Sequence, residues 1–272
     1  MKSYAKRSNI FKMTFDTFKR CVDKIPPNVQ IDFSGMAEPW LNPECTKMLL
    51  YAHEQGHGIS VYTTTVGMLP SDVKNIESVP FRRFSVHLAD KERYANIEIN
   101  ESYLETIDAV INSKITNREY MTMGELHPKV KQLIRKRIPK TRMISRAGNL
   151  NLGVYPPIPL RLMGPIFCRS AGSRFDHNVL LPNGDVLICC MDYGMQHVLG
   201  NLMSSDYMAI FNGSEFFKLK RGLHDDSIDI LCRYCENASS QDEYMLPKKK
   251  VMGSKLTKYF NQLVYRMYKQ TK

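Results

Sequence analysis

The sequence predicts an α/β protein: a parallel sheet or partial barrel, then a small cysteine-rich α+β module and a C-terminal helix. Two observations lead to this fold class. Helix-type and strand-type hydrophobic patterns alternate over the first 150 residues, and four cysteines, two of them in a Cys-x-x-Cys, fall in the last third. Alternation of this kind favours parallel strands joined by right-handed helical crossovers.

The expected elements follow from hydrophobic spacing and from the residues at their ends. Residues 14–25 place four apolar side chains on one helical face and end at a Pro-Pro pair. Residues 43–55 begin with Pro and are followed by Gly56, the usual order at a helix start and end. The other expected helices are residues 104–111 and 130–138, and the expected strands are 29–33, 59–63, 84–88, 119–123 and 142–145.

The pattern changes after residue 150. Residues 151–165 contain four prolines and two glycines, which predicts a linker. Residues 178–181 and 186–189 predict a hairpin closed by Pro-Asn-Gly-Asp, and residues 205–223 a helical stretch. The expected organisation is the α/β part (1–150), the linker (151–165), the cysteine-rich module (166–240) and a basic helix (241–272).

The net charge of +11 is concentrated in that last segment. Eight of the 38 basic residues follow Glu243, and no acidic residue does, so 30 basic residues face 27 acidic ones in the rest of the chain. Its apolar residues recur at helical spacing. The stripe would pack on the body with its lysines in water. The alternative is contact with an anionic membrane surface, a nucleic acid or an acidic partner. No specific nucleic acid is predicted.

Cysteine usage predicts a reducing compartment. The chain has seven cysteines, an odd number, and its first residues lack the apolar core of a secretory signal. No stretch approaches the roughly 20 apolar residues of a membrane span. We therefore expect a cytoplasmic protein, in which such cysteines bind metal or perform redox chemistry rather than form disulfides.

Four cysteines predict a metal or iron–sulfur site: Cys168, Cys189, Cys232 and Cys235. Thiolates three positions apart on a tight turn can face one metal centre, and two more complete a tetrahedral set. Cys190 competes with Cys189, although the Gly-x-x-x-x-Cys spacing from Gly184 favours Cys189. Ordinary buried thiols are the alternative.

Polar residues follow the expected strands at the edge where α/β domains bind ligands. The first strand leads into Ser-Gly-Met-Ala-Glu-Pro (residues 34–39), and the second ends in Thr63, Thr64 and Thr65. The third contains Ser85 and His87, and Arg146 follows the last. A guanidinium there suits a carboxylate or a phosphate.

Taken in order, these segments resemble the radical S-adenosylmethionine (radical SAM) proteins. FSGMAEPWLNPE resembles the loop near the methionine end of the cofactor, and GISVYTTTVGM the following strand. CRSAGSRFDHNVLLPNGDVLICCMDYG, LGNLM and LCRYC are similar to the SPASM or shorter twitch extension, which holds auxiliary [4Fe–4S] clusters. Four ligands fit the single-cluster twitch form. The resemblance runs from about residue 10 to about residue 238.

The resemblance implies a role for each of these groups. Glu38, with the backbone of Gly35, Met36 and Ala37, would bind the amino end of SAM. Thr63, Thr64, Thr65 and Ser85 would line the cofactor cleft, and Arg146 could reach it. Cys168, Cys189, Cys232 and Cys235 would ligate the auxiliary cluster. A full-length relative would abstract a hydrogen atom from a peptide or small-molecule substrate, with electrons from a flavodoxin or ferredoxin.

The sequence departs from this family at its catalytic end. Radical SAM enzymes carry Cys-x-x-x-Cys-x-x-Cys after the first strand, and the chain has no such triplet. Ala37 stands where Gly is usual, and Thr64 where Asn is usual. We therefore expect a truncated or catalytically inactive form. Two other hypotheses stay open: a zinc-binding protein with four cysteine ligands, and a non-catalytic partner protein that docks through its basic tail.

Overall fold

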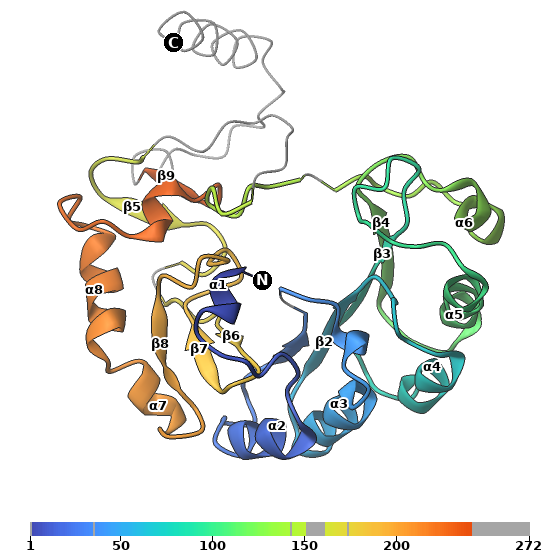
Figure 1. Ribbon diagram of the computed structural model, residues 1–272, viewed down its shortest axis with the longest axis horizontal. Helices are drawn as coiled ribbons and strands as arrows, with labels where there is room; N and C mark the ends of the chain where they lie inside the picture. Colours follow the sequence, from blue (N-terminus) through green and yellow to red (C-terminus); the bar gives the residue numbers. More distant parts are fainter. Residues whose placement is uncertain (1, 35, 142, 151–160, 173, 241–272) are drawn as a thin grey trace, which may run out of the picture.

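The computed structural model describes residues 2–34, 36–141, 143–150, 161–172 and 174–240. Their elements follow an arc with a sheet and its helices on one side and a smaller module on the other (Figure 1). The expected linker (151–165) is described only from residue 161, and the expected basic helix (241–272) lies outside the described residues.

The sheet has four parallel strands in chain order. Its register places Phe33 opposite Val61, and Val61 opposite Phe84. The four strands are β1 (Ile31–Phe33), β2 (Ile59–Thr63), β3 (Arg83–Leu88) and β4 (Arg118–Thr122). The parallel α/β arrangement expected from the sequence is therefore confirmed.

Helices cover the outer face of this sheet and alternate with its strands (Figure 1). Side-chain caps mark two of their starts: Thr14 accepts a hydrogen bond from the Thr17 N–H, and Asn100 accepts one from the Tyr103 N–H. The helices are α2 (Phe15–Val22), α3 (Cys45–Glu54), α4 (Pro70–Ile76), α5 (Glu101–Asn112) and α6 (Pro128–Leu133).

The main core lies between this helical layer and the sheet. Phe84, Val86 and Leu88 alternate along β3 and are fully buried there. The facing helices contribute apolar side chains such as Leu49 and Ile107. Alternate residues of a strand point to one face, so the remaining strand residues point to the opposite, inner face.

Two of the sequence predictions are wrong in this region. The strand expected at 142–145 is not formed: residue 142 lies outside the described part, residues 143–145 are loop, and only Lys140 bridges to β4, at Thr122. The helix expected at 130–138 forms as Pro128–Leu133 and ends five residues before the predicted end; Pro139 disfavours helical geometry only at residue 138. The short helix α4 was not predicted.

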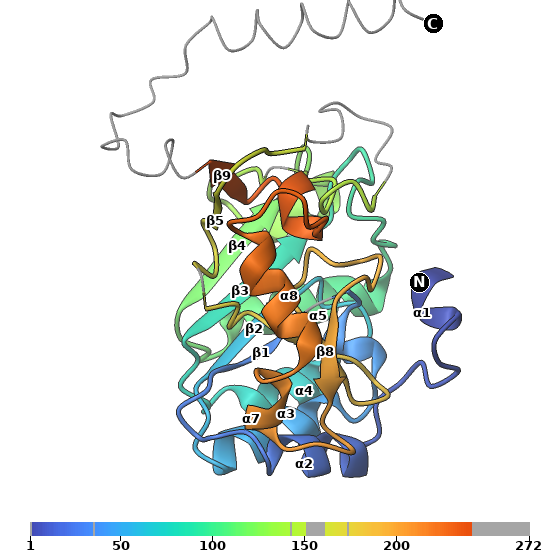
Figure 2. The ribbon, with the colours of Figure 1, turned by 90° about the vertical axis from the view of Figure 1, so that its left-hand side faces the viewer.

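The module contains two small antiparallel sheets. The expected hairpin is confirmed, with Gly184 at φ 88° in its turn. The expected helical stretch forms α7 (Tyr207–Ile210) and α8 (Ser214–Gly222), and α8 lies over β8 (Figure 2). The strands are β5 (Ile166–Cys168) with β9 (Ala238–Ser240), and β6 (Val179–Leu180), β7 (Asp185–Leu187) and β8 (Val198–Asn201).

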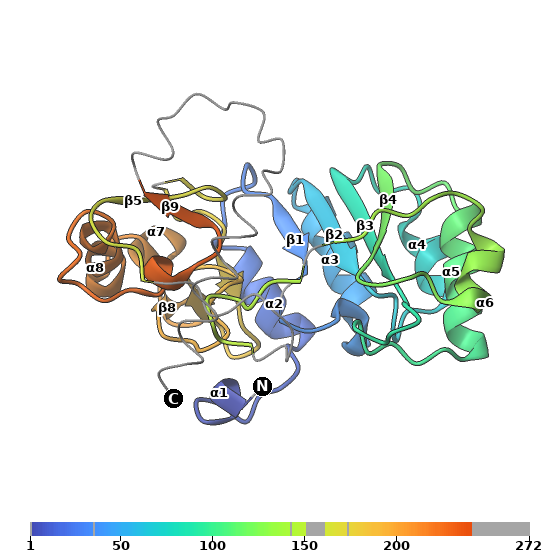
Figure 3. The ribbon, with the colours of Figure 1, turned by 90° about the horizontal axis from the view of Figure 1, so that it is seen from above.

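The first helices connect the module to the sheet, whose edge strand β1 lies nearest the module (Figure 3). Tyr4 of α1 (Lys2–Ala5) belongs to a core cluster with Leu187 and Met195 of the module. Beyond the end of α2, the Lys24 Nζ donates to the Leu202 carbonyl (2.6 Å) and the Ser205 carbonyl (3.1 Å). The two parts therefore share polar and apolar contacts.

None of the helices in the described part of the chain combines the length and the apolar composition that crossing a membrane requires.

The core between sheet and helices predicts a large effect for Phe84→Ala. Phe84 is fully buried and packs edge-on against Phe81, with ring centroids 5.1 Å apart. We expect the substitution to lower the free energy of unfolding by about 3–5 kcal/mol in urea titrations. The matched control is Phe217, which is 53% exposed on α8. Phe217→Ala should change the free energy of unfolding by under about 0.5 kcal/mol. Equal losses in the two variants would contradict this placement of the core.

Candidate metal centre and cofactor cleft

The inner face of the sheet is polar. Parallel sheets buried on both faces usually have near-continuous apolar strands. Here each of the first three strands alternates instead, and hydrogen bonds run across the face: the Gln30 Nε2 donates to Asp32 Oδ1 (2.5 Å) and Ser60 Oγ (3.0 Å). The polar inner-face residues are Asp32, Ser60, Tyr62, Arg83, Ser85, His87 and Glu119, and the apolar Met121 of β4 lies on the same face opposite His87. A polar inner surface suits a polar ligand better than a packed core.

Glu38 lies at the carboxyl-end edge of this sheet. It caps the short 3₁₀ helix η1 (Pro39–Leu41) through the Trp40 N–H (3.4 Å). Its carboxylate also accepts hydrogen bonds from the Thr63 hydroxyl (2.5 Å), the Thr64 N–H (2.6 Å) and the Thr64 hydroxyl (2.7 Å). The structure thus brings together three of the residues predicted for the cofactor cleft.

This carboxylate has no basic partner among the described residues. Burial raises the pKa of Glu38, while the hydrogen bonds from Thr63 and Thr64 oppose the shift. Beside it, Thr65 is buried at φ 64°, and its hydroxyl oxygen has no hydrogen-bond partner. An unpaired buried hydroxyl in a strained residue is typical of a ligand site. These residues fit an ammonium-bearing ligand such as the methionine end of SAM.

None of the other predicted cleft residues in the described part of the chain shares a hydrogen bond with Glu38. Ser85 is fully buried on β3 and donates its hydroxyl to Glu119. Met36 packs with Tyr4 and the module, and Ala37 is exposed. Gly35 lies outside the described residues.

Arg146 lies in a strained loop that faces the module. Arg146, Ala147 and Gly148 all have positive φ (55°, 55° and 76°). The Arg146 Nη1 lies 3.4 Å from both the Cys190 carbonyl oxygen and Sγ, and its guanidinium is 5.4 Å from the Tyr193 ring centroid. Among the described residues it has no carboxylate partner and no hydrogen bond to Glu38 or Thr63–Thr65.

Glu236 holds this loop in place. Its Oε1 accepts from the Ser145 N–H (2.5 Å) and hydroxyl (2.6 Å), and its Oε2 from the Ala147 N–H (2.8 Å). Burial alone would raise the pKa of Glu236, but these hydrogen bonds outweigh it and the pKa lies below the usual value. Glu236 directly follows Cys235, so the loop at the sheet end is tied to the cysteine module.

The four predicted ligand cysteines come from three separate turns of the module. Cys168 ends β5, Cys189 follows β7, and the Cys-x-x-Cys pair lies in and just after η2 (Leu231–Tyr234). These cysteines lie close enough to raise one another's pKa. Cys168 and Cys235 raise the pKa of Cys189, the other three raise that of Cys232, and Cys168 raises that of Cys235. The structure therefore gathers all four predicted cysteines in one region.

Burial dominates the acidity of these thiols. It raises the pKa of Cys189 to about 12 and of Cys235 to about 11, and that of Cys232 well above its usual value. At Cys235 a backbone donor acts in the opposite direction, because the Asn237 N–H lies 3.4 Å from its Sγ and lowers its pKa. The Ala171 N–H lies 3.4 Å from Cys168 Sγ. Without a metal Cys189, Cys232 and Cys235 are neutral thiols, and binding a metal releases their protons.

The donor set fits a tetrathiolate metal or an iron–sulfur cluster. Four sulfur atoms are the ligand number of a [4Fe–4S] cluster or a structural zinc. Amide N–H groups aimed at sulfur stabilise thiolate charge. As they stand, the side chains of the described residues include no group of three or more His, Cys, Asp or Glu in metal-holding geometry. The four ligands stay a prediction.

Arg233, between the two cysteines of the pair, anchors their turn. It is fully buried, and its Nη1 donates to the carbonyls of Leu162 (2.8 Å) and Gly164 (2.9 Å). Its Nη2 donates to the Gly222 carbonyl at the end of α8 (2.7 Å). This contact fixes the Cys-x-x-Cys turn against the module.

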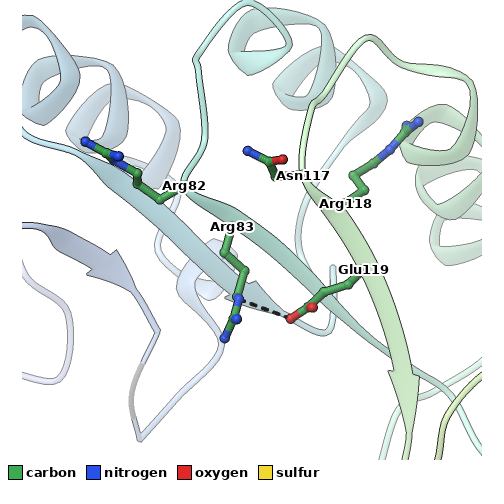
Figure 4. Close-up of a pocket in the computed structure, with 5 residues that line it drawn as sticks. All are labelled: Arg82, Arg83, Asn117, Arg118 and Glu119. Carbon is green, nitrogen blue, oxygen red and sulfur yellow. Dashed lines mark ion pairs between the residues drawn. The ribbon is translucent and has the colours of Figure 1, made fainter. Parts of the chain in front are cut away.

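A hollow of about 350 Å³ lies at the opposite end of the sheet, where β3 and β4 begin (Figure 4). Arg83 points at Glu119, with 3.4 Å between Nε and Oε1. The Arg118 guanidinium donates to the Ile111 carbonyl (3.1 Å) at the end of α5, and the Asn117 amide to the Phe81 carbonyl (2.7 Å). Four of the five side chains that line the hollow therefore pair with neighbouring groups of the fold, and the fifth, Arg82, is exposed.

Sequence reasoning missed Glu236, Arg233 and the polar inner face. Only the inner face had a local signal, because ISVYT and RFSVHL alternate polar and apolar residues where a doubly buried strand would be apolar throughout. The hydrogen-bond partner Ser145 lies 91 positions from Glu236, and the partner Leu162 lies 71 positions from Arg233. No local sequence pattern therefore marks Glu236 or Arg233.

Comparisons with known proteins find matches to the cysteine module and to the overall fold. Residues 168–236 match SPASM, an iron–sulfur cluster-binding domain. The solved structure of BtrN in complex with AdoMet and 2-DOIA matches this chain with a TM-score of 0.55 and 14% sequence identity. The match covers 84% of this chain and 81% of the BtrN chain. An open conformation of BtrN has a TM-score of 0.51 and 15% identity, with coverages of 83% and 80%. No curated protein sequence matches the chain.

The chain is thus an α/β protein whose residues 168–236 match the SPASM iron–sulfur cluster-binding domain. Its sheet and module together have the fold of BtrN. The fold class expected from the sequence, a parallel α/β part followed by a small cysteine-rich module, is confirmed, and the expected SPASM-type module is matched at residues 168–236.

The partly buried carboxyl group of Glu38 predicts a pH dependence. A carboxyl group with a raised pKa holds its proton more tightly in the folded state, so its contribution to the free energy of unfolding falls as the pH rises from about 4.5 through the folded pKa. Glu38→Gln should remove this fall, measured as the difference between the two proteins in urea titrations from about pH 4 to pH 7. The other carboxyl groups are common to both proteins and cancel. A difference that is constant over this range would contradict the raised pKa.

Proposed function

We propose that Cys168, Cys189, Cys232 and Cys235 hold one auxiliary [4Fe–4S] cluster, as in the single-cluster twitch form. The observation that carries this proposal is the gathering of four cysteines from three turns, with backbone N–H groups aimed at their sulfur atoms. The match of the same residues to an iron–sulfur cluster-binding domain favours iron over zinc. When bound, such a cluster supplies one-electron redox chemistry.

We propose a SAM site at the carboxyl-end edge of the sheet. Glu38 would accept from the amino group of SAM, with Thr63 and Thr64 orienting its carboxylate and Thr65 offering its free hydroxyl. Gly35, Met36 and Ala37 would contribute backbone, and Ser85 the wall beside them. BtrN, which has the same fold, was solved with AdoMet.

Arg146 is proposed to bind the carboxylate of SAM. A guanidinium with no carboxylate partner among the described residues, stacked near Tyr193, can pair with an anion in bidentate fashion. Burial, reinforced by Arg146, lowers the pKa of His87, so this neighbour is neutral near pH 7 and does not compete for the anion. The cleft would then hold both charged ends of the amino-acid part.

The given residues contain no Cys-x-x-x-Cys-x-x-Cys, so we propose that by themselves they bind SAM without cleaving it. With such a cluster, the class of reaction would be hydrogen-atom abstraction from a peptide or small molecule on the polar inner face. A flavodoxin or ferredoxin in the cytoplasm would supply electrons. The proposed parts are the SAM-binding part (1–150), the linker (151–165), the iron–sulfur module (166–240) and the basic tail (241–272).

Adjacent cysteines offer a matched test of the ligand set. After anaerobic reconstitution with iron and sulfide, Cys189→Ser should lose iron–sulfur absorbance and most of its bound iron, because a cluster missing one thiolate loses affinity. Cys190→Ser should keep both, since Cys190 faces Arg146. The reverse pattern would assign Cys190 as the ligand. A colourless wild-type protein that contains zinc would replace the iron–sulfur proposal with a four-cysteine zinc site.

The SAM site is tested by Arg146→Gln. Loss of a charge-assisted hydrogen bond costs roughly 1.5–3 kcal/mol, so SAM should bind about 10- to 100-fold more weakly in calorimetry. Arg82→Gln removes the same charge from an exposed position at the other end of β3 and should bind SAM like the wild type. Equal affinities of all three proteins would exclude Arg146 as a SAM contact.

A further inference from the structure

His197 directly precedes β8 and is buried between the turn that contains Cys189 and the turn that contains Cys232. It is 3% exposed, and its two ring nitrogens contact different elements. Nδ1 lies 2.6 Å from Glu215 Oε1 on α8, and Nε2 lies 3.0 Å from the Leu231 backbone nitrogen. Leu231 immediately precedes Cys232, the first cysteine of the Cys-x-x-Cys pair.

These partners determine the tautomer of the ring. A backbone N–H can only donate, so Nε2 must carry the lone pair that accepts from Leu231. The proton of the neutral ring is then on Nδ1, where it is donated to the Glu215 carboxylate. Glu215 therefore orients the imidazole, and the imidazole orients the amide next to Cys232.

The backbone of His197 is tied to the other cysteine turn. Its N–H donates to Asp192 Oδ2 (2.8 Å), and Asp192, fully buried, also accepts from the Gln196 N–H (2.8 Å). The Asp192 N–H in turn donates to the Cys189 carbonyl (3.2 Å). One residue thus links the Cys189 turn to the Cys232 turn, which are 43 positions apart in the sequence.

We propose that His197 is a positioning residue that sets the spacing between Cys189 and Cys232 for the metal group they bind. The inference rests on the proposed iron–sulfur function of these cysteines. In this role the neutral imidazole accepts the Leu231 N–H at Nε2, and Glu215 holds the ring in place at Nδ1. The role requires no change of protonation. Partners that orient ligand-bearing segments commonly change metal affinity 10- to 100-fold when they are removed.

Two substitutions separate the contacts of the ring. Gln places an acceptor oxygen near the position of Nε2, so His197→Gln should keep the Leu231 hydrogen bond. Asn reaches only to the position of Nδ1, so His197→Asn should keep Glu215 and lose Leu231. His177→Gln is the control, because His177 is an exposed histidine of the same module. Circular dichroism establishes that each variant is folded before reconstitution.

The measurement is the rate at which an iron chelator removes iron from the anaerobically reconstituted protein, together with the electron paramagnetic resonance spectrum of the reduced protein. His197→Asn should lose iron at least about 10-fold faster, with an altered spectrum. His197→Gln should stay within about threefold of the wild type and keep its spectrum, as should the control.

The outcomes distinguish this inference from the function it rests on. If the wild type takes up no iron, the proposed cluster itself is wrong. If the wild type binds iron and His197→Asn matches it in rate and spectrum, His197 does not position the site. Should His197→Asn fail to fold, His197→Leu decides, because its side chain fills similar space but offers no acceptor to the Leu231 N–H. It should lose iron at least about 10-fold faster than the wild type, and a wild-type rate would overturn the positioning role.

Discussion

The structure depends on a sheet that has helices on only one of its faces. Helices α2 to α6 bury the apolar side chains of the strands on the outer face, and the inner face is left to polar residues such as Ser85 and Glu119. Buried polar groups need partners, and the fully buried Ser85 finds one in Glu119 on the neighbouring strand. A second, smaller module stands beside the sheet and continues the arc (Figure 1).

The module is attached at several points rather than through one covalent connection. Tyr4, Lys24 and Glu236 each join it to the sheet side by a different kind of contact: apolar packing, an ammonium on two carbonyls, and a carboxylate on two amides. Charge-assisted hydrogen bonds of this kind are directional and strong. They fix the orientation of the cysteine turns relative to the carboxyl-end edge, where Glu38 lies.

Local pattern was sufficient for the main elements of the fold. The strand at Ile59–Thr63 and the hairpin around Gly184 follow from apolar continuity and turn chemistry, and both formed as expected. The strand expected after residue 141 failed because it had only a short pattern and no partner beyond Lys140. Cysteine spacing predicted the module, but His197 and Glu236 could not be found this way. Their partners lie 34 and 91 positions away in the sequence.

One consequence concerns insertions and deletions. Glu236 follows Cys235 directly, and its carboxylate holds three consecutive left-handed residues whose backbone would otherwise relax. Adding or removing one residue there would shift the carboxylate by about 3.8 Å, farther than a hydrogen bond can stretch. The distance along the chain from the cysteine pair to Glu236 is therefore as restricted as the spacing within the pair, and homologous chains could be aligned on Cys-x-x-Cys-Glu as one unit.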